Sequence, residues 1–179
     1  MYFKKILLFS LLSTVSCYLT PTQFSTKTLL YTKNNNDEIF QKKHDLILDV
    51  NCKGGETTDC LQEIFFNFKV IGLDKEDENI KLAKENFPHS EFFHTDFESK
   101  SFSNNFMKES CYFININSYE NFNVILSKCY FFLQSGGKFV IPFNGPLKEI
   151  YNGLHHHDLH KKLKVTVKRY ENMIEFTKI

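Results

Sequence analysis

The chain has 179 residues and a formal net charge of +1 at pH 7. This length fits one domain with a substantial core, and the nearly balanced charge gives no electrostatic basis for binding nucleic acid. The five cysteines have no C-x-x-C spacing, which argues against both a metal site and a disulfide framework.

The first 43 residues have the composition of targeting segments. Residues 1–19 combine a basic start, an apolar run and small residues, which is the layout of a signal peptide and is too short for a comfortable membrane span. Residues 20–43 are rich in Ser, Thr, Lys and Asn, with no acid before Asp37, as in a disordered linker or a transit peptide. We expect entry into the secretory pathway, ending in a plastid-like organelle or else in secretion or the endomembrane lumen, and no stable membrane span in the mature form.

From residue 44 onward, short apolar runs alternate with segments of helical spacing. Strands are predicted at 46–50, 69–73, 91–94, 111–116 and 138–143, and helices at 56–68, 77–86, 119–133 and 147–161. The tail, LKVTVKRY followed by MIEFTKI, has the alternation of an antiparallel hairpin. Residues 44–179 are therefore predicted to form an α/β domain with a doubly wound, mostly parallel seven-stranded sheet that ends in this hairpin.

Acids stand at the carboxyl ends of the first three predicted strands. They are Asp49, Asp74 and Asp96, and the glycine-bearing turn NCKGGETT follows the first of them. Ligands of doubly wound sheets bind beyond the carboxyl ends of the strands. A glycine turn lets the backbone approach a ligand, and an ionised carboxylate accepts hydrogen bonds from ribose hydroxyls. The pattern predicts a nucleotide-like ligand that contains a ribose.

This arrangement resembles the class I S-adenosylmethionine-dependent methyltransferases, particularly those that act on small molecules. Their acid-x-Gly-x-Gly-x-Gly motif is similar to residues 49–55, DVNCKGG, and their second motif is similar to VIGLDKEDENIKLAKENFP. Their third motif is similar to HTDF, and their Leu-x-Pro-Gly-Gly turn to residues 133–137, LQSGG. The resemblance implies the Rossmann-like methyltransferase fold, with S-adenosyl-L-methionine as cofactor and a small molecule as substrate.

The resemblance also implies roles for individual residues. Asp49 would orient the methionine ammonium, directly or through water, Asp74 would accept from the ribose hydroxyls, and Asp96 would accept from the adenine amine. The other expected cofactor contacts are Asn51, Cys52, Lys53 and Gly55 in the turn, Lys75 after the second strand, Phe97 beside the adenine, and Asn115. Asn117 and Tyr119 are further candidates for lining the pocket. No catalytic base is assigned, because many such enzymes need little more than alignment of an activated sulfonium.

Two departures from the family pattern leave alternatives open. Asn51 and Lys53 replace the first two glycines of the motif. Asn tolerates left-handed backbone, but the side chain of Lys53 stands where backbone normally approaches the cofactor. Lys53 either pairs with the methionine carboxylate or marks a degraded site, or Gly54 takes over the turn.

Three functions are therefore weighed. The first is a methyltransferase, for which a partner chain is expected to supply the substrate lid because the core has almost no insertion. The second is a catalytically inactive relative that serves as a cofactor-binding or partner-binding module. The third, a nicotinamide dinucleotide domain, is disfavoured because the turn lacks G-x-G-x-x-G spacing.

Histidines gather near the C-terminus at positions 155, 156, 157 and 160. On a helix, the spacing of His156 and His160 would place two imidazoles on one face, as a metal site requires. No acid stands in a recognisable third-ligand position. The favoured interpretation is a solvated helix face, and no metal is predicted.

Overall fold

The computed structural model describes residues 46–104, 110–143, 147–168 and 172–179. The expected leader at 1–19, the linker or transit-like segment at 20–43 and the domain start at residue 44 lie outside the described residues. Among the described helices, none combines the length and the apolar character needed to cross a membrane.

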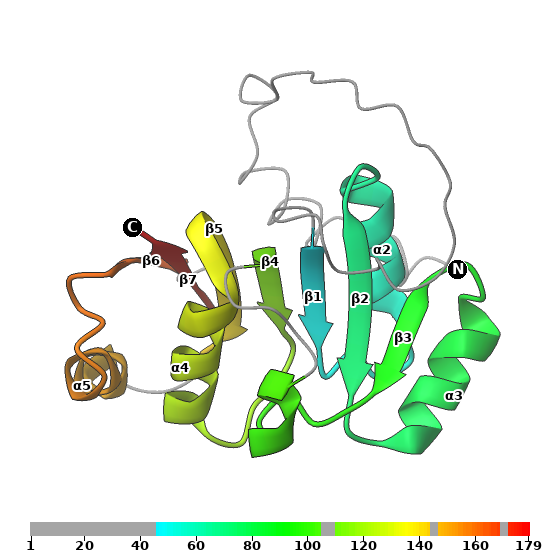
Figure 1. Ribbon diagram of the computed structural model, residues 1–179, viewed down its shortest axis with the longest axis horizontal. Coiled ribbons are helices and arrows are strands. Elements are labelled where there is room, and N and C mark those ends of the chain that lie inside the picture. Colours follow the sequence, from blue (N-terminus) through cyan, green and yellow to red (C-terminus); the bar gives the residue numbers. More distant parts are fainter. Residues whose placement is uncertain (1–45, 105–109, 144–146, 169–171) are drawn as a thin grey trace. The chain divides into compact units, whose positions relative to one another are not determined.

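The described residues form a seven-stranded sheet in the order β3-β2-β1-β4-β5-β7-β6 (Figure 1). The strands are β1 (Leu46–Val50), β2 (Lys69–Asp74), β3 (Glu91–His94), β4 (Cys111–Ile116), β5 (Leu133–Pro142), β6 (Leu163–Lys168) and β7 (Met173–Lys178). The first five run parallel, whereas β7 lies antiparallel to both β5 and β6. The predicted mixed sheet with its C-terminal hairpin is confirmed.

Helices cover the two faces of this sheet. They are α2 (Glu56–Ile64), α3 (Asp77–Asn86), α4 (Phe122–Phe132) and α5 (Leu147–His156), with a short 3-10 helix η2 (Lys100–Asn104). The buried residues of α4 and α5 join the large core cluster with one face of β1, β4, β5 and β7. On the other face, Phe65 just after α2 stacks on Phe113 of β4 at 5.9 Å, and α3 packs on Phe92 of β3.

Three predicted helices are longer than the structure shows. The first ends at Ile64 rather than residue 68, because Phe65 leaves helical geometry and Phe68 turns back to pack on Tyr112 at 5.1 Å. The helix predicted from 119 begins only at residue 122, after the N-cap Asn121.

The last helix ends at His156, not at the predicted residue 161. His160 lies beyond the helix. His156 and His160 therefore do not share one helical face, as was expected from their spacing, and that expectation is wrong. The stacked imidazole pair is instead His155 and His160, whose ring centroids lie 4.4 Å apart.

The glycine pair before the fifth strand does not form a separate turn. β5 already begins at Leu133, and its pairing with β4 jumps from Leu133 opposite Cys111 to Lys138 opposite Phe113. The intervening residues form a bulge, in which Gly136 has a left-handed φ of 77°. The predicted strand start at residue 138 is therefore wrong.

Candidate functional site

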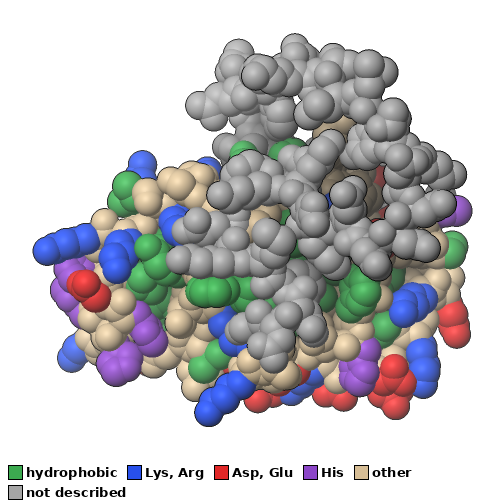
Figure 2. Space-filling model, in the orientation of Figure 1, with side chains coloured by type: hydrophobic (Ala, Val, Ile, Leu, Met, Phe, Trp, Pro, Cys, Tyr) green, Lys and Arg blue, Asp and Glu red, His purple; other side chains and the backbone are tan. Residues whose placement is uncertain are grey.

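The polar residues predicted as ligand contacts converge where the parallel strands end. We call this region the strand-end rim and define it as residues 51–55, 75–76, 95–99 and 117–121, which follow β1, β2, β3 and β4. Along the lower margin of the molecule, where Figure 1 places these strand ends, acidic side chains gather (Figure 2).

The turn between β1 and α2 has left-handed backbone at alternate positions. Asn51, Lys53 and Gly55 have φ values of 56°, 51° and 91°. A side chain in this region costs roughly 1–2 kcal/mol, and less for Asn, which can bond locally. The turn is held because the Cys52 amide donates to the Leu73 carbonyl at 3.0 Å and the Gly55 amide donates to the Cys52 carbonyl at 3.0 Å. The two non-glycine residues thus occupy left-handed positions of the kind that glycine favours.

Gly55 stands where a side chain would collide with the core. A Cβ atom there would lie 2.8 Å from Cζ of Phe92 and 3.0 Å from Cβ of Ala83. Cys52 packs in the same small cluster and is 3% exposed, and burial raises the pKa of its thiol to about 12. Cys52 is therefore a buried residue whose thiol stays neutral.

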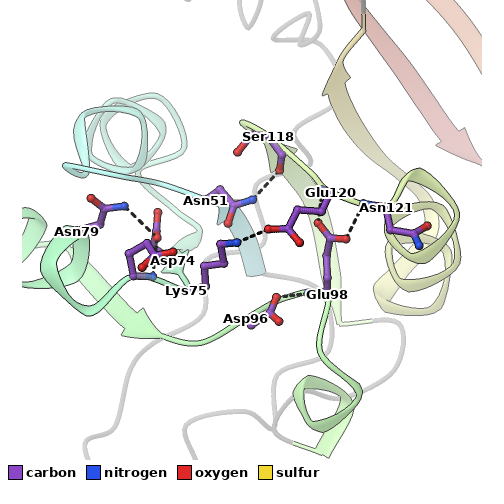
Figure 3. A network of polar contacts seen from close by, with 10 residues as sticks. Asn51, Asp74, Lys75, Asn79, Asp96, Glu98, Ser118, Glu120 and Asn121 are labelled. Atoms are coloured by element: carbon purple, nitrogen blue, oxygen red, sulfur yellow. Dashed lines mark hydrogen bonds and ion pairs between the residues drawn. The ribbon is translucent and has the colours of Figure 1, made fainter. Parts of the chain in front are cut away.

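Asp74 ties the turn to the end of β2. Its Oδ2 accepts from the Lys53 amide at 2.9 Å, and its Oδ1 accepts from the Glu76 amide at 2.9 Å and from Asn79 Nδ2 at 3.1 Å (Figure 3). Each carboxylate oxygen accepts about two hydrogen bonds. Among the described residues, Oδ2 thus has capacity for one further hydrogen bond, whereas Oδ1 already accepts two, and Asp74 is 3% exposed.

Asp49 lies beneath the turn and is fully buried. Its Oδ2 accepts from Thr58 Oγ1 at 2.6 Å, and its Oδ1 accepts from the side-chain amides of Asn115 at 2.8 Å and Asn117 at 2.7 Å. Burial raises its pKa to about 6, against the opposing effect of these hydrogen bonds and with a smaller contribution from the charge of Asp74. In this geometry Asp49 would act on a ligand through the two asparagines.

Asp96 and Phe97 follow β3 but face different surroundings. Asp96 is exposed, and the described contacts engage only its Oδ1, which accepts from the Glu98 amide at 2.8 Å. Phe97 is 2% exposed, with its ring 4.8 Å from that of Phe102 and 6.2 Å from that of Phe132. The structure brings Asp96 to the rim and packs the Phe97 ring against Phe102 and Phe132 in the core.

Contacts that no sequence motif indicates also hold the rim together. Glu98 accepts from the amides of Glu120 and Asn121, each at 2.8 Å, and Glu120 forms an ion pair with Lys75 (Figure 3). Asn51 Nδ2 donates to the Ser118 carbonyl at 2.6 Å. Sequence reasoning did not assign site roles to Thr58, Asn79, Glu98 or Glu120. The acid at position 98, in the same loop as Asp96, is a weak signal, but no local pattern reveals its partners 22 and 23 residues away.

The chemistry of the rim favours hydroxyl, amine and cationic groups. Its carboxylates belong to Glu76, Asp96, Glu98 and Glu120, with Asp74 next to them at the end of β2, and its lysines are Lys53 and Lys75. Carboxylates accept hydrogen bonds and attract positive charge, whereas phosphates bind at exposed amides and basic side chains. Such a rim suits a nucleoside that carries a cation better than it suits a dinucleotide with two phosphates.

Comparison with known proteins gives a consistent result. A family model described as a methyltransferase domain matches residues 48–141, which include the turn, Asp74, Asp96 and Asn115. The 235L protein of Invertebrate iridescent virus 6, a methyltransferase by name, is 29% identical over 96 residues. This match covers 52% of the chain but 36% of that protein, so the chain spans well under half of this curated relative.

Solved structures share the fold at low identity. A TehB-like methyltransferase from Corynebacterium glutamicum that depends on S-adenosylmethionine has a TM-score of 0.57 and 17% identity, over 77% of this chain and 82% of that chain. Geranyl diphosphate C-methyltransferase from Streptomyces coelicolor, solved with S-adenosyl-L-homocysteine, has a TM-score of 0.53 and 12% identity, over 75% and 71%. At these identities the two structures support the fold and leave the substrate open.

Proposed function

Because this chain belongs to the methyltransferase-domain family, we propose that it binds S-adenosyl-L-methionine at the strand-end rim and transfers the methyl group to a small molecule. The proposal rests above all on the hydrogen bond from the Lys53 amide to Asp74. This bond holds the left-handed turn against the acid at the end of β2. In the family, this turn and this acid surround the methionine and ribose portions of the cofactor.

The residues present fit such a cofactor with specific adjustments. Asp74 Oδ2 would accept one ribose hydroxyl, and Asp96 would accept from the adenine amine. Asn115 and Asn117, held by Asp49, would face the methionine portion. The exposed Lys53 ammonium would pair with the methionine carboxylate. The lysine that stands in place of the motif glycine would then itself contact the ligand. When bound, the cofactor supplies an activated methyl group, and the contribution of the chain is to bind and align it.

A small-molecule acceptor is supported by charge. The net charge of +1 and the carboxylates of the rim oppose binding of polyphosphate chains such as RNA, which require a positive surface. The loops after β1 and β2 are short, which supports the expectation that closure over the substrate involves a partner chain.

Calorimetric titration of the full chain with S-adenosyl-L-homocysteine and S-adenosyl-L-methionine tests the proposal. We expect saturable binding of both, and transfer of a labelled methyl group to a small-molecule fraction of an extract. Folding is checked beforehand by circular dichroism. No heat at millimolar ligand from a folded sample would reject the assignment.

A catalytically inactive binding module is the second candidate, and Lys53 is the observation that favours it. Its left-handed backbone is strained, and its side chain occupies a glycine position of the motif. Replacement by glycine separates the two functions. In an active site that uses Lys53, Lys53→Gly weakens binding of S-adenosyl-L-homocysteine; in a degraded site, the same change strengthens it severalfold.

We further propose that residues 1–43 direct the protein into the secretory pathway. The basic start, the apolar run and the acid-free segment up to residue 36 support this. A fluorescent fusion of residues 1–40, together with N-terminal sequencing of the protein from its native cell, tests the proposal. A cytosolic protein that begins at Met1 would contradict it without affecting the assignment of the fold.

A further inference from the structure

Lys75 and Glu120 form an ion pair that crosses the end of β1. Lys75 directly follows β2, and Glu120 lies between β4 and α4. Since β2 and β4 are the two neighbours of β1 in the sheet, a contact between the residues that follow them spans the position where β1 ends. Figure 3 shows the two side chains reaching toward one another between Asn51 and Asp96.

The backbone at both ends of this bridge is fixed. The Glu120 amide donates to Glu98 at 2.8 Å, and the Lys75 carbonyl lies 2.9 Å from His94 Nε2, which donates to it in the Nε2-protonated tautomer. The side chains themselves are 44% exposed for Lys75 and 75% exposed for Glu120. The bridge can therefore open by rotation of two side chains, without movement of the loops that carry them.

We propose that the Lys75–Glu120 ion pair closes the entrance to the cofactor site and sets its affinity, because it lies across the end of β1, which a cofactor in contact with both Asp74 and Asn117 has to cross. This inference rests on the proposed function, since it takes the rim to be the cofactor site. The resemblance implies a direct cofactor contact for Lys75 and no role for Glu120, whereas this inference gives both residues an effect on affinity through their ion pair.

Salt, rather than pH, is the means of opening this bridge. Hydrogen bonding and charge attraction within the pair raise the pKa of Lys75 and lower the pKa of Glu120. Both groups therefore stay charged throughout the neutral range. Because the pair is exposed, salt screens its attraction effectively.

The test uses the full chain and an uncharged nucleoside, 5′-methylthioadenosine, so that salt acts on the protein's own ion pair and not on a charged ligand. We expect wild-type affinity to rise about two- to fivefold between low and high sodium chloride, a range that fits an exposed ion pair. Glu120→Gln and Lys75→Met should bind more tightly than wild type at low salt by a similar factor, and their affinities should no longer rise with salt.

Lys81→Met is the matched control. It breaks the exposed Lys81–Asp77 ion pair on α3, which does not span the strand ends, and should leave both the affinity and its salt dependence as in wild type. If Glu120→Gln and Lys75→Met bind like wild type, or more weakly, the inference is wrong.

A parallel titration with S-adenosyl-L-homocysteine separates the two claims. Binding by wild type with no difference in either variant rejects the bridge but keeps the proposed function. Absence of binding in wild type and both variants rejects the proposed function and the bridge with it.

Discussion

The turn after β1 and the bulge at the start of β5 both match glycine motifs of the family, but their glycines serve different purposes. In the turn, Gly55 is enclosed by the side chains of Phe92, Ala83 and Phe87. In the bulge, a Cβ atom on Gly136 would have no heavy atom within 4 Å. Both Gly55 and Gly136 have left-handed φ, but of these two glycines only Gly55 is also required by the packing around it.

The comparison also explains why two glycines of the turn motif are dispensable. Asn51 and Lys53 keep left-handed backbone because hydrogen bonds to Ser118 and Asp74 hold them. Their side chains are partly or fully exposed, in contrast to the enclosed position of Gly55. A motif glycine is replaceable where its neighbours leave space and supply bonds.

The largest expected effect is the loss of stability in Gly55→Ala, and Gly136→Ala is the variant to compare it with. Gly55→Ala should lower the free energy of unfolding by about 3 kcal/mol or more, because the left-handed penalty adds to the overpacking against Phe92. Gly136→Ala should cost only about 1 kcal/mol, from the backbone alone. Urea unfolding of both variants measures these losses in the free energy of unfolding. Equal losses would show that the enclosure of Gly55 adds nothing to the cost of its backbone conformation.

Asp49, which is buried beneath the turn, should make the free energy of unfolding depend on pH. Its pKa is raised from 3.8 to about 6 by burial, so at pH 5 the folded chain holds a proton that the unfolded chain has lost. The contribution of this group to the free energy of unfolding therefore falls as pH rises from about 4 to 6, by about 3 kcal/mol in total, and stays low above pH 6.

Urea unfolding between pH 4 and pH 7 tests this for wild type and Asp49→Asn, which lacks the titrating group. The decline in that window should be absent from the variant. Asp96→Asn, at an exposed acid of the same rim, should keep it. A wild-type profile parallel to that of Asp49→Asn would show that burial of Asp49 has no such effect.

The smallest expected effect separates the side chain of Lys53 from its backbone. Lys53→Met keeps a Cβ atom, and with it the left-handed cost, but removes the ammonium. Affinity for S-adenosyl-L-homocysteine should fall about tenfold, as for loss of a charged hydrogen-bonding group. Affinity for 5′-methylthioadenosine, which has no carboxylate, should not change. Equal losses for both ligands would show that Lys53 does not contact the carboxylate.

The sequence predicted the strands of the sheet better than the ends of its helices. Strands 46–50, 91–94 and 111–116 and helix 77–86 have the predicted bounds, because apolar runs and a following proline are local signals. The early end of α2 depends on Phe65 stacking on a strand about 50 residues later in the chain, a contact that no local pattern encodes.

The same limit applies to the site. The placement of Asp49, Asp74 and Asp96 at one edge could be predicted because the carboxyl ends of strands in a parallel sheet lie together. Thr58 and Glu120 could not, since their roles depend on hydrogen bonds and ion pairs between loops. The burial of Phe97 could not be predicted from the sequence either, because a residue after a strand can turn toward the core as readily as toward a ligand.

The location of ligand binding is the most direct test of the account. In a ¹⁵N-resolved spectrum of the full chain titrated with S-adenosyl-L-homocysteine, the largest shifts should occur at the Lys53 and Glu98 amides, which donate to Asp74 and Asp96. The amides of Leu163 and Ile179, at the β6–β7 end of the sheet, should be unaffected. An unchanged spectrum, or shifts confined to β6 and β7, would contradict a cofactor site at the strand-end rim.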